Sequence, residues 1–268
     1  ERLPFAARAR LLSLGGQKNV SGFVKSFTGS QRFVTDYLIE EVLEQQPAEV
    51  RDFLLKTSVL EKLTAPLCDA LTGCTDSETL LPALERANLL LVPLDESGEW
   101  YRYEHLFSDL LRHELTKAAG DDGVADVHRR ASAWYAANGF DREAIDHALA
   151  ARDWETAADL LVEVAGRYAN AGEVTTLGAW LEALPEEVLL TRPPLCCVHI
   201  LPLMLTGRPD EAEAFVDRME SIWGEDPVQY ARITACRSEF ASFRGDVARS
   251  TELAQQAQHT CPNHDHQQ

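Results

Sequence analysis

The chain has 268 residues, 45% of them hydrophobic, and its 25 basic and 43 acidic side chains give a net charge of −18. The length indicates two or three domains, and the apolar content is typical of a globular protein rather than a disordered one. The acidity disfavours direct nucleic-acid binding, because an acidic surface repels a phosphate backbone. No apolar run approaches the roughly 20 residues of a bilayer span, so we expect no membrane contact and a cytoplasmic location.

Residues 1–32 are basic and partly helical, and residues 1–35 carry a net charge of +5. Turns are expected at Gly15-Gly16 and at Gly29. The segment beginning at Gly15 contains glycine and lysine, but neither the spacing nor the hydroxyl of a phosphate-binding loop. The first residue is Glu1 rather than methionine, which suggests an excised piece of a longer protein.

Four helices are predicted in the next segment. The first covers about residues 33–44, and the second starts at Pro47, because proline is tolerated in a first turn. Thr64 is a suitable cap for the third, and the fourth begins near Ser77 and stops at Asn88, a residue that tolerates left-handed backbone. The apolar residues of the second and fourth helices recur at helical spacing: Val50, Phe53, Leu54 and Thr57, and then Leu80, Leu81 and Leu84.

The period then changes to that of a β-hairpin. Residues 90–94 and 100–103 read as strands around a turn at 95–98, and an amphipathic helix follows from about Leu106 to Leu115. Several helices, a hairpin and a closing helix indicate a winged helix over residues 33–118. The apolar run ending at Asp95 also resembles the Walker B strand of an ATPase, but Pro93 interrupts it and no phosphate-binding loop precedes it. We therefore interpret it as a strand of the wing.

After a predicted linker at 118–123, glycines recur at a near-constant interval. Gly139, Gly172, Gly207 and Gly245 are 33, 35 and 38 residues apart. This period is typical of antiparallel helix pairs of the tetratricopeptide type, and we assign residues 119–268 to such repeats. Because stacked repeats build binding surfaces and rarely carry chemistry, we expect an effector on their concave face.

The repeat interpretation makes predictions about individual positions. Each glycine should end the first helix of a pair. Tyr135 and Tyr168, four residues before the first two glycines, should then be buried against the partner helix. Ala144 and Ala212, five residues after the first and third, should lie at the closest helix–helix contact.

The amino-acid sequence of six blocks closely resembles the MalT-like family of large ATP-dependent LuxR-type transcriptional regulators. The blocks are FVTDYLIEEVL at 33–43, FLLKTSVL at 53–60, LERANL at 84–89, WYRYEHLF at 100–107, HRRASAWY at 128–135 and EAIDHA at 143–148. The resemblance covers about residues 20–260, and its blocks are specific in combination although each alone is weak.

The resemblance implies a nucleotide-binding domain, a winged helix, a helical-repeat sensor and a C-terminal DNA-binding helix-turn-helix. In that scheme residues 1–32 end the helical lid of the nucleotide domain, which would bind ATP or ADP in the full-length protein. The sensor would receive an inducer or a partner protein, and the winged helix would contact the neighbouring nucleotide domain. The activated full-length protein could then form a homo-oligomer.

Glu104 and His105 are the candidate site residues. In related signal-transducing ATPases a winged-helix histidine contacts the β-phosphate of ADP. The usual sequence motif of the family places that histidine at the position of Glu104. Here His105 follows Glu104, so the pair is a candidate sensor of the nucleotide state. The alternative is that both residues merely begin a helix, where an acidic side chain is favourable.

Two other functional classes are weighed against the regulator. A stand-alone helical-repeat adaptor would bind a peptide or protein without any ATPase. An enzyme is disfavoured, because no catalytic constellation stands out. Cys261, His264 and His266 have the letters of a metal site but lack a fourth ligand, so we expect neither a metal nor a cofactor in this segment.

Overall fold

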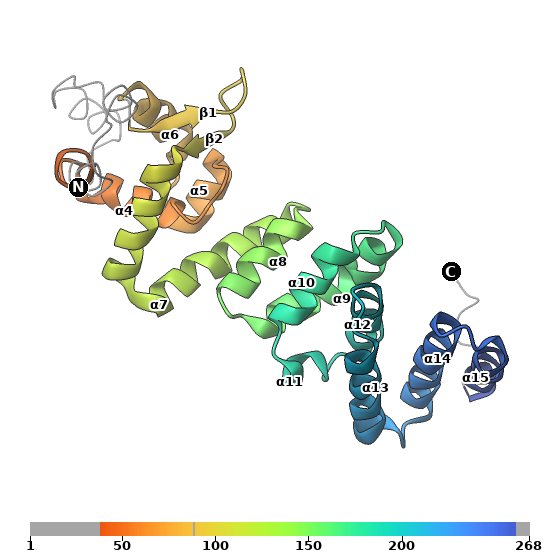
Figure 1. Cartoon of the computed structure of the whole chain (residues 1–268). Coiled ribbons are helices and arrows are strands. Elements are labelled where there is room, and N and C mark those ends of the chain that lie inside the picture. The colour runs from red at the N-terminus through yellow and green to blue at the C-terminus, as the bar shows by residue number, and fades with distance from the viewer. Residues whose placement is uncertain (1–37, 88, 261–268) are drawn as a thin grey trace. The chain divides into compact units, whose positions relative to one another are not determined.

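The computed structural model describes residues 38–87 and 89–260, which divide into two compact units between Arg152 and Asp153 (Figure 1). The prediction of a mostly α-helical chain with a small hairpin and antiparallel helix pairs is confirmed. Within the described residues, no helix is both long and apolar enough to cross a bilayer. The predicted lid at 1–32, the stop at Asn88 and the tail containing Cys261, His264 and His266 lie outside the described residues.

The first unit begins with four helical segments near the predicted positions. They are η1 (Leu38–Leu43), α4 (Ala48–Thr57), α5 (Ala65–Thr72) and α6 (Ser77–Arg86). η1 is a π-helix, closed by a bond from the Glu44 amide to the Ile39 carbonyl at 2.9 Å. Thr64 occupies the N-cap of α5, but the predicted capping bond is absent. One of its two usual donors is missing, because Pro66 has no amide hydrogen.

The hairpin pairs β1 (Leu91–Pro93) antiparallel to β2 (Tyr101–Tyr103). The Asp95 carboxylate accepts the Glu99 amide at 3.0 Å and so holds the turn. The antiparallel pairing confirms that the apolar run before Asp95 is a wing strand rather than a Walker B strand. Leu63 forms an isolated antiparallel bridge with β2. Its amide donates to the Tyr101 carbonyl at 2.8 Å, and its carbonyl accepts from the Tyr101 amide at 2.9 Å.

Apolar side chains of these helices and of the wing form one core. Its largest fully buried members include Phe53, Leu54, Leu63, Leu67, Leu81, Leu84, Phe107 and Leu111. Because α4, α5 and the start of α7 each contribute to this core, the position of the helix that follows the hairpin is fixed by burial.

Helix α7 (His105–Ala137) runs through the segment that we predicted as a linker. Only Gly120, at φ 64° and ψ 179°, leaves helical geometry, and the helix kinks there. Two helical stretches therefore meet inside the predicted linker at 118–123, which is helical on both sides of Gly120 rather than irregular. Alanine and aspartate allow a helix on both sides of the break, and glycine alone supplies the left-handed backbone.

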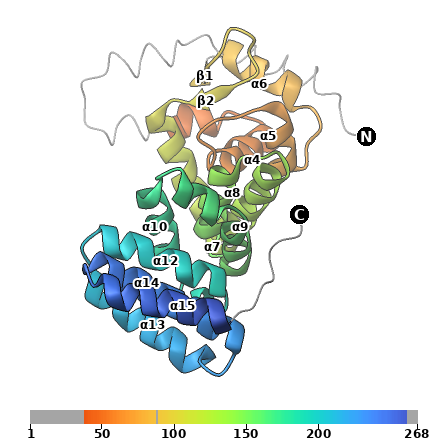
Figure 2. The same cartoon turned by 90° about the vertical axis from the view of Figure 1, so that its right-hand side faces the viewer.

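Four helix pairs follow the predicted period (Figure 2). The pairs are the second half of α7 with α8 (Asp141–Ala150), α9 (Trp154–Asn170) with α10 (Val174–Ala183), α12 (Pro193–Leu205) with α13 (Pro209–Trp223), and α14 (Pro227–Phe243) with α15 (Val247–Thr260). Gly139, Gly172, Gly207 and Gly245 all have φ 78° and stand just after the first helix of a pair. The prediction that each of these glycines ends a helix is confirmed.

Each glycine turn has the same pair of hydrogen bonds. In the first, the Gly139 amide donates to the Ala136 carbonyl at 3.3 Å and the Phe140 amide donates to the Tyr135 carbonyl at 3.0 Å. The other three turns repeat these bonds between corresponding residues. This is the Schellman motif, which satisfies carbonyls at the end of a helix and requires a left-handed residue.

The predicted packing positions are confirmed with one exception. Tyr135 is buried at 4% exposure, and Ala144 and Ala212 are fully buried. Tyr168 is only half-buried, although its ring does meet Trp180 of the partner helix edge-on at 4.9 Å. Its predicted burial is therefore wrong.

The second unit stacks its three pairs, with the short helix α11 (Glu186–Leu189) inserted between the first and second. Figure 2 shows α12, α13, α14 and α15 side by side, and α12 packs against both α9 and α14. Arginines join neighbouring helices through exposed ion pairs: Arg192 with Glu155 and Asp159, Arg208 with Glu182, Arg218 with Glu186, Arg237 with Asp217 and Glu220, and Arg244 with Glu213. Exposed pairs contribute little each, so buried apolar contacts hold the stack together.

Replacing Gly207 by alanine should lower the free energy of unfolding by about 1–2 kcal/mol, because the side chain strains a left-handed residue. A Cβ at Gly207 would meet no atom within 4 Å, so the cost is in the backbone alone. Gly166, inside α9 and equally uncrowded, is the matched control. Gly166→Ala should stabilise by about 0.5–1 kcal/mol. Equal effects of the two substitutions in urea unfolding would contradict the turn assignment.

Candidate functional site

The predicted pair Glu104 and His105 lies at the start of α7, directly after β2. Glu104 is the N-cap residue and is half-buried, whereas His105 is exposed in the first turn. The Glu104 amide donates to the Leu90 carbonyl at 2.8 Å, so this end of the helix is tied to the wing. His105 therefore has the accessibility that a contact with a neighbouring domain needs.

The residue before this pair anchors it to the core. Tyr103 is buried at 4% exposure, and its hydroxyl lies 2.7 Å from the Thr57 hydroxyl on α4. Burial raises the pKa of the Tyr103 phenol above its ordinary value. A displacement of the helix start would break this buried hydrogen bond, so the position of His105 is coupled to α4.

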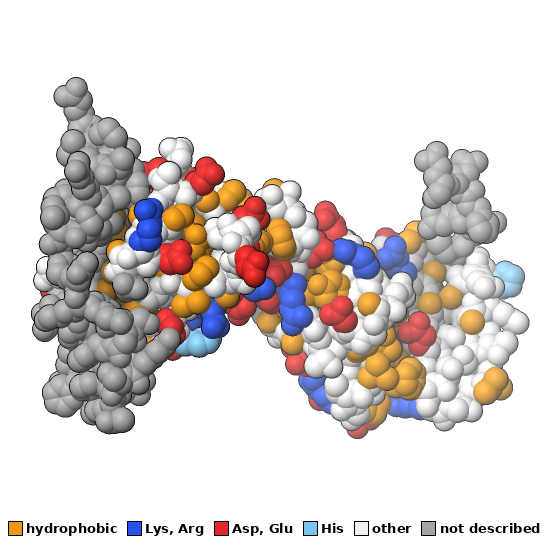
Figure 3. Space-filling view, turned by 90° about the horizontal axis from the view of Figure 1, so that it is seen from above, with side chains coloured by type: hydrophobic (Ala, Val, Ile, Leu, Met, Phe, Trp, Pro, Cys, Tyr) orange, Lys and Arg blue, Asp and Glu red, His pale blue; other side chains and the backbone are white. Residues whose placement is uncertain are grey.

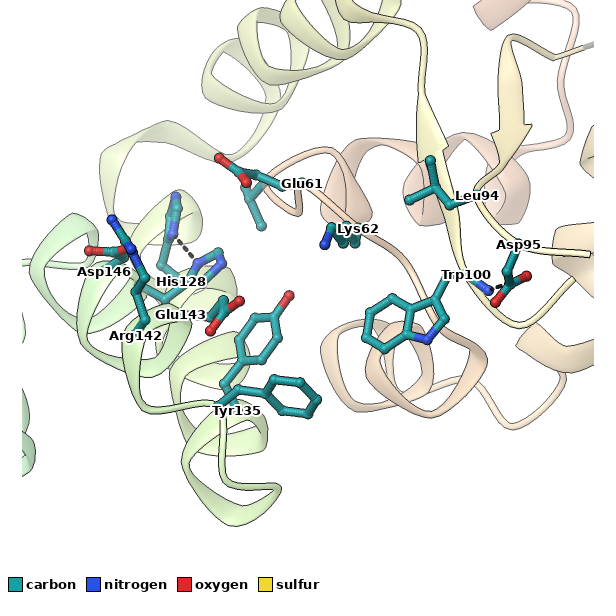
Figure 4. Close-up of a pocket in the computed structure, with 13 residues that line it drawn as sticks. Glu61, Lys62, Leu94, Asp95, Trp100, His128, Tyr135, Arg142, Glu143 and Asp146 are labelled. Atoms are coloured by element: carbon teal, nitrogen blue, oxygen red, sulfur yellow. Dashed lines mark hydrogen bonds between the residues drawn. The ribbon is translucent and has the colours of Figure 1, made fainter. Parts of the chain in front are cut away.

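A second feature, which we call the aromatic pocket, lies elsewhere in the first unit (Figure 4). Its volume is about 760 Å³. The lining comes from the segment after α4, the wing, the second half of α7 and the start of α8: Val59, Glu61, Lys62, Leu94, Asp95, Trp100, His128, Tyr135, Phe140, Arg142, Glu143, Asp146 and His147. Neither Glu104 nor His105 belongs to this lining, so the structure does not bring the predicted pair into the pocket.

The aromatic rings of the pocket form a continuous wall around Phe140. The Trp100 ring meets the Phe140 ring edge-on, with centroids 6.3 Å apart, and the Tyr135 ring does so at 5.8 Å. Outside the lining, Trp134 stacks on Phe140 at 6.0 Å. Trp100 comes from the wing and Phe140 from the first glycine turn, so the wall joins the winged helix to the first helix pair.

Charged side chains surround the Tyr135 hydroxyl. Figure 4 shows this hydroxyl directed toward the space between Glu143 and Lys62, with Glu61 on the opposite side of that space. Burial raises the pKa of the Tyr135 phenol, and the Glu143 and Glu61 carboxylates raise it further. Tyr135 is therefore a neutral hydrogen-bonding group beside two carboxylates at neutral pH.

Two histidines close the pocket on the side of the helix pair. The Nδ1 atoms of His128 and His147 lie 2.8 Å apart, and the His147 ring stacks on Tyr135 at 5.4 Å. Burial, followed by the charge of Arg112, lowers the pKa of His128. Burial, followed by His128, lowers the pKa of His147 to about 4. Only one of the two Nδ1 atoms can carry the shared proton, so the contact requires at least one neutral ring.

The histidine pair predicts a loss of stability in acid. The pKa of His147 is about 4 in the folded chain and 6.5 in the unfolded one, so the unfolded chain binds more protons between these values. The contribution of His147 to the free energy of unfolding should be complete well above pH 6.5 and fall as pH decreases toward 4. Between pH 7.5 and pH 5 we expect His147 to account for about 1–2 kcal/mol of the loss.

The measurement is urea unfolding at both pH values. His147→Gln, whose amide can still bond to His128, should lose that part of the pH dependence, and His113→Gln, an exposed control on the same unit, should retain it. Identical pH dependence in all three chains would refute the assignment.

The sequence contained a signal for the histidine pair that we did not use. Once Gly139 is known to be a turn, residues at similar distances on either side face each other. The Ser132 hydroxyl donates to the Ala144 carbonyl at 2.8 Å across this turn. His128 and His147 each lie about one helical turn further from Gly139, on the same two helices. Trp100 could not be found in this way, because its contact with Phe140 joins distant segments.

The described residues contain no group of three potential ligands that could hold a metal ion. The pocket therefore offers hydrogen bonding, charge and aromatic surface. These are means of binding a molecule or a neighbouring domain.

Comparison with known proteins gives two kinds of relative. Residues 39–122 match the family model described as the MalT winged helix domain. The HTH-type transcriptional regulator MalT of Cronobacter sakazakii is 32% identical over 264 residues, which are 96% of this chain and 29% of that protein. The serine/threonine-protein kinase PknK of Mycobacterium tuberculosis (strain H37Rv) is 33% identical over 234 residues, 87% of this chain and 21% of that protein.

MalT of Yersinia enterocolitica is 33% identical over 215 residues, which are 80% of this chain and 24% of that protein. The chain thus spans between about a fifth and a third of the length of these curated relatives. The similarity links it to a transcriptional regulator family, and a similar segment also occurs in a protein named as a kinase.

Proposed function

The chain is MalT-like, with a winged helix of the MalT type at residues 39–122, and from this premise we propose that it relays a signal within an ATP-dependent bacterial transcriptional regulator. In this proposal the helical repeats receive an inducer or a partner protein. The winged helix passes that event to a nucleotide domain that precedes it. The nucleotide state then governs oligomerisation and promoter binding by the full-length protein.

The observation that carries the proposal is that side-chain contacts join the winged helix to the first helix pair across the kink of α7. This helix begins at the wing and ends in the first helix pair, with a single break at Gly120. The Arg130 guanidinium donates to the Leu71 carbonyl at 3.4 Å, and Trp100 of the wing meets Phe140 of the first turn. A change in the first helix pair would therefore act on the start of α7, where His105 is exposed.

Glu104 and His105 are our candidates for the contact with bound nucleotide in the full-length protein. A histidine in the first turn of a helix lies where anions are favoured, because the helix dipole adds positive potential. Glu104 opposes an anion, so His105 is the stronger candidate. His105→Ala should change the ratio of ADP to ATP affinity in the full-length protein, with little effect on stability because the side chain is exposed.

We propose a regulatory rather than catalytic role for this segment, and its negative charge argues against nucleic-acid binding. On the face in Figure 3, basic side chains are interspersed with acidic ones rather than gathered into a stripe. We accordingly propose no direct contact of this segment with DNA. We also propose that it does not associate with a membrane and that it lies in the cytoplasm. The alternative is a stand-alone adaptor, in which the repeats bind a peptide or protein and no nucleotide domain exists.

The complete gene separates these alternatives. The regulator requires a phosphate-binding loop upstream and a DNA-binding helix-turn-helix downstream, and the adaptor requires neither. For the relay itself, promoter activation by the full-length protein should be measured for Phe140→Ala and for Phe243→Ala, a control whose side chain is exposed in the second unit. We expect Phe140→Ala alone to uncouple activation from the inducer, and normal induction in both variants would refute the relay.

The chain alone should neither hydrolyse ATP nor shift promoter DNA. Turnover of ATP that persists through purification to homogeneity would show that the segment itself carries catalysis. Specific DNA binding at moderate salt would likewise contradict the assigned role.

A further inference from the structure

We propose that the aromatic pocket is a binding site for a small organic cation, an amine that carries an apolar group. This inference goes beyond the relay and does not depend on it, because it concerns the chain alone. The pocket volume of about 760 Å³ is in the range that small-molecule sites occupy. Its lining combines one apolar wall with charged side chains, of which more are acidic than basic.

The apolar wall suits a cation. Trp100, Tyr135 and Phe140 present aromatic rings from two different elements, and Trp100 and Phe140 remain partly exposed. The face of an aromatic ring attracts a positive charge, and tryptophan does so most strongly. The same rings would cover the apolar group of the ligand.

The charge of the lining also favours a cation. Glu61, Asp95, Glu143 and Asp146 stand against Lys62 and Arg142, which leaves a net charge of −2. The two histidines add no positive charge at neutral pH, because burial depresses the pKa of both. The hairpin amides engage Asp95, and Figure 4 shows Asp146 beside Arg142 and away from the Tyr135 hydroxyl. Glu61 and Glu143 are therefore the carboxylates best placed to meet an ammonium group.

Tyr135 supplies a third polar contact. Its hydroxyl points into the space between Glu143 and Lys62, and it can accept a hydrogen bond from an ammonium group (Figure 4). An ammonium there would have the Glu143 and Glu61 carboxylates as counter-ions. An anion would instead have to bind Lys62 or Arg142, and the Glu143 and Glu61 carboxylates would repel it.

The experiment is a titration of the chain with two probes of similar size and opposite charge. 2-Phenylethylamine is the cation and 3-phenylpropionate is the anion. Binding is followed by NMR at the Trp100 indole resonance, which Trp100→Phe identifies. We expect saturable binding of the amine in the millimolar range, weakened by salt, and no saturable binding of the anion.

Glu61→Gln and Glu143→Gln should each weaken amine binding by about fivefold, since each removes one partly solvated counter-ion. Both side chains are exposed, so these variants should fold normally. Glu96→Gln, at the tip of the wing and outside the pocket, is the matched control and should bind as the unmodified chain does.

Three results would overturn the proposal. The first is tighter or equal binding of 3-phenylpropionate, which would make the site an anion site. The second is the lack of saturation by the amine, and the third is unchanged amine binding in both glutamine variants. None of these results bears on whether the full-length protein relays a signal, so the two proposals can fail separately.

Discussion

Replacing Tyr135 by alanine should lower the free energy of unfolding of the chain by about 3 kcal/mol. The side chain is only 4% exposed and contacts Phe140 and His147 within the first helix pair. Its removal leaves a cavity that the surrounding rings fill only in part, because Trp134 and Phe140 are already stacked on each other. Urea unfolding followed by tryptophan fluorescence measures the change.

Two controls separate the cavity from other causes. Tyr135→Phe keeps the ring and should lower the free energy of unfolding by less than about 1 kcal/mol. Tyr168→Ala removes the tyrosine at the same position of the next pair, but that side chain is half-buried and the loss should be clearly smaller. Equal losses at Tyr135 and Tyr168 would show that burial does not determine the effect.

Replacing Ala144 by leucine should destabilise the first helix pair by about 2–3 kcal/mol. Ala144 is fully buried in α8, and its carbonyl accepts a bond of 2.8 Å from the Ser132 hydroxyl on α7. Three further carbons at this position would force the two helices apart and strain that bond. Thermal unfolding of the purified variant measures the loss.

Ala150→Leu is the matched control, since Ala150 is exposed near the end of the same helix. It should change stability by no more than about 0.5 kcal/mol. A neutral or stabilising Ala144→Leu would mean that the helices are not in close contact there, contrary to the repeat assignment.

Local patterns were sufficient to predict most of the helices. The apolar spacing of α4 and α6 and the glycine of each turn are properties of neighbouring residues, so they are visible in one sequence. Two features depend on contacts between separate segments and were missed. These are the pairing of Leu63 with Tyr101 and the half-exposure of Tyr168.

The site was less predictable than the fold. Glu104 and His105 were predicted from the family resemblance, and the structure places them directly after β2 and at the start of α7. The aromatic pocket needs Trp100 and Phe140 to meet across segments that are far apart in the chain. Packing of the first helix pair against the winged helix decides that contact, and no periodicity in the sequence encodes it.

The most direct test of the relay is hydrogen exchange in the full-length protein with bound ADP and with bound ATP analogue. Our account predicts that exchange changes together at the start of α7 and in α8, because the contacts of Arg130 with the Leu71 carbonyl and of Trp100 with Phe140 join the winged helix to the first helix pair. Exchange that differs only outside residues 38–152, or a full-length protein that binds no nucleotide, would contradict it.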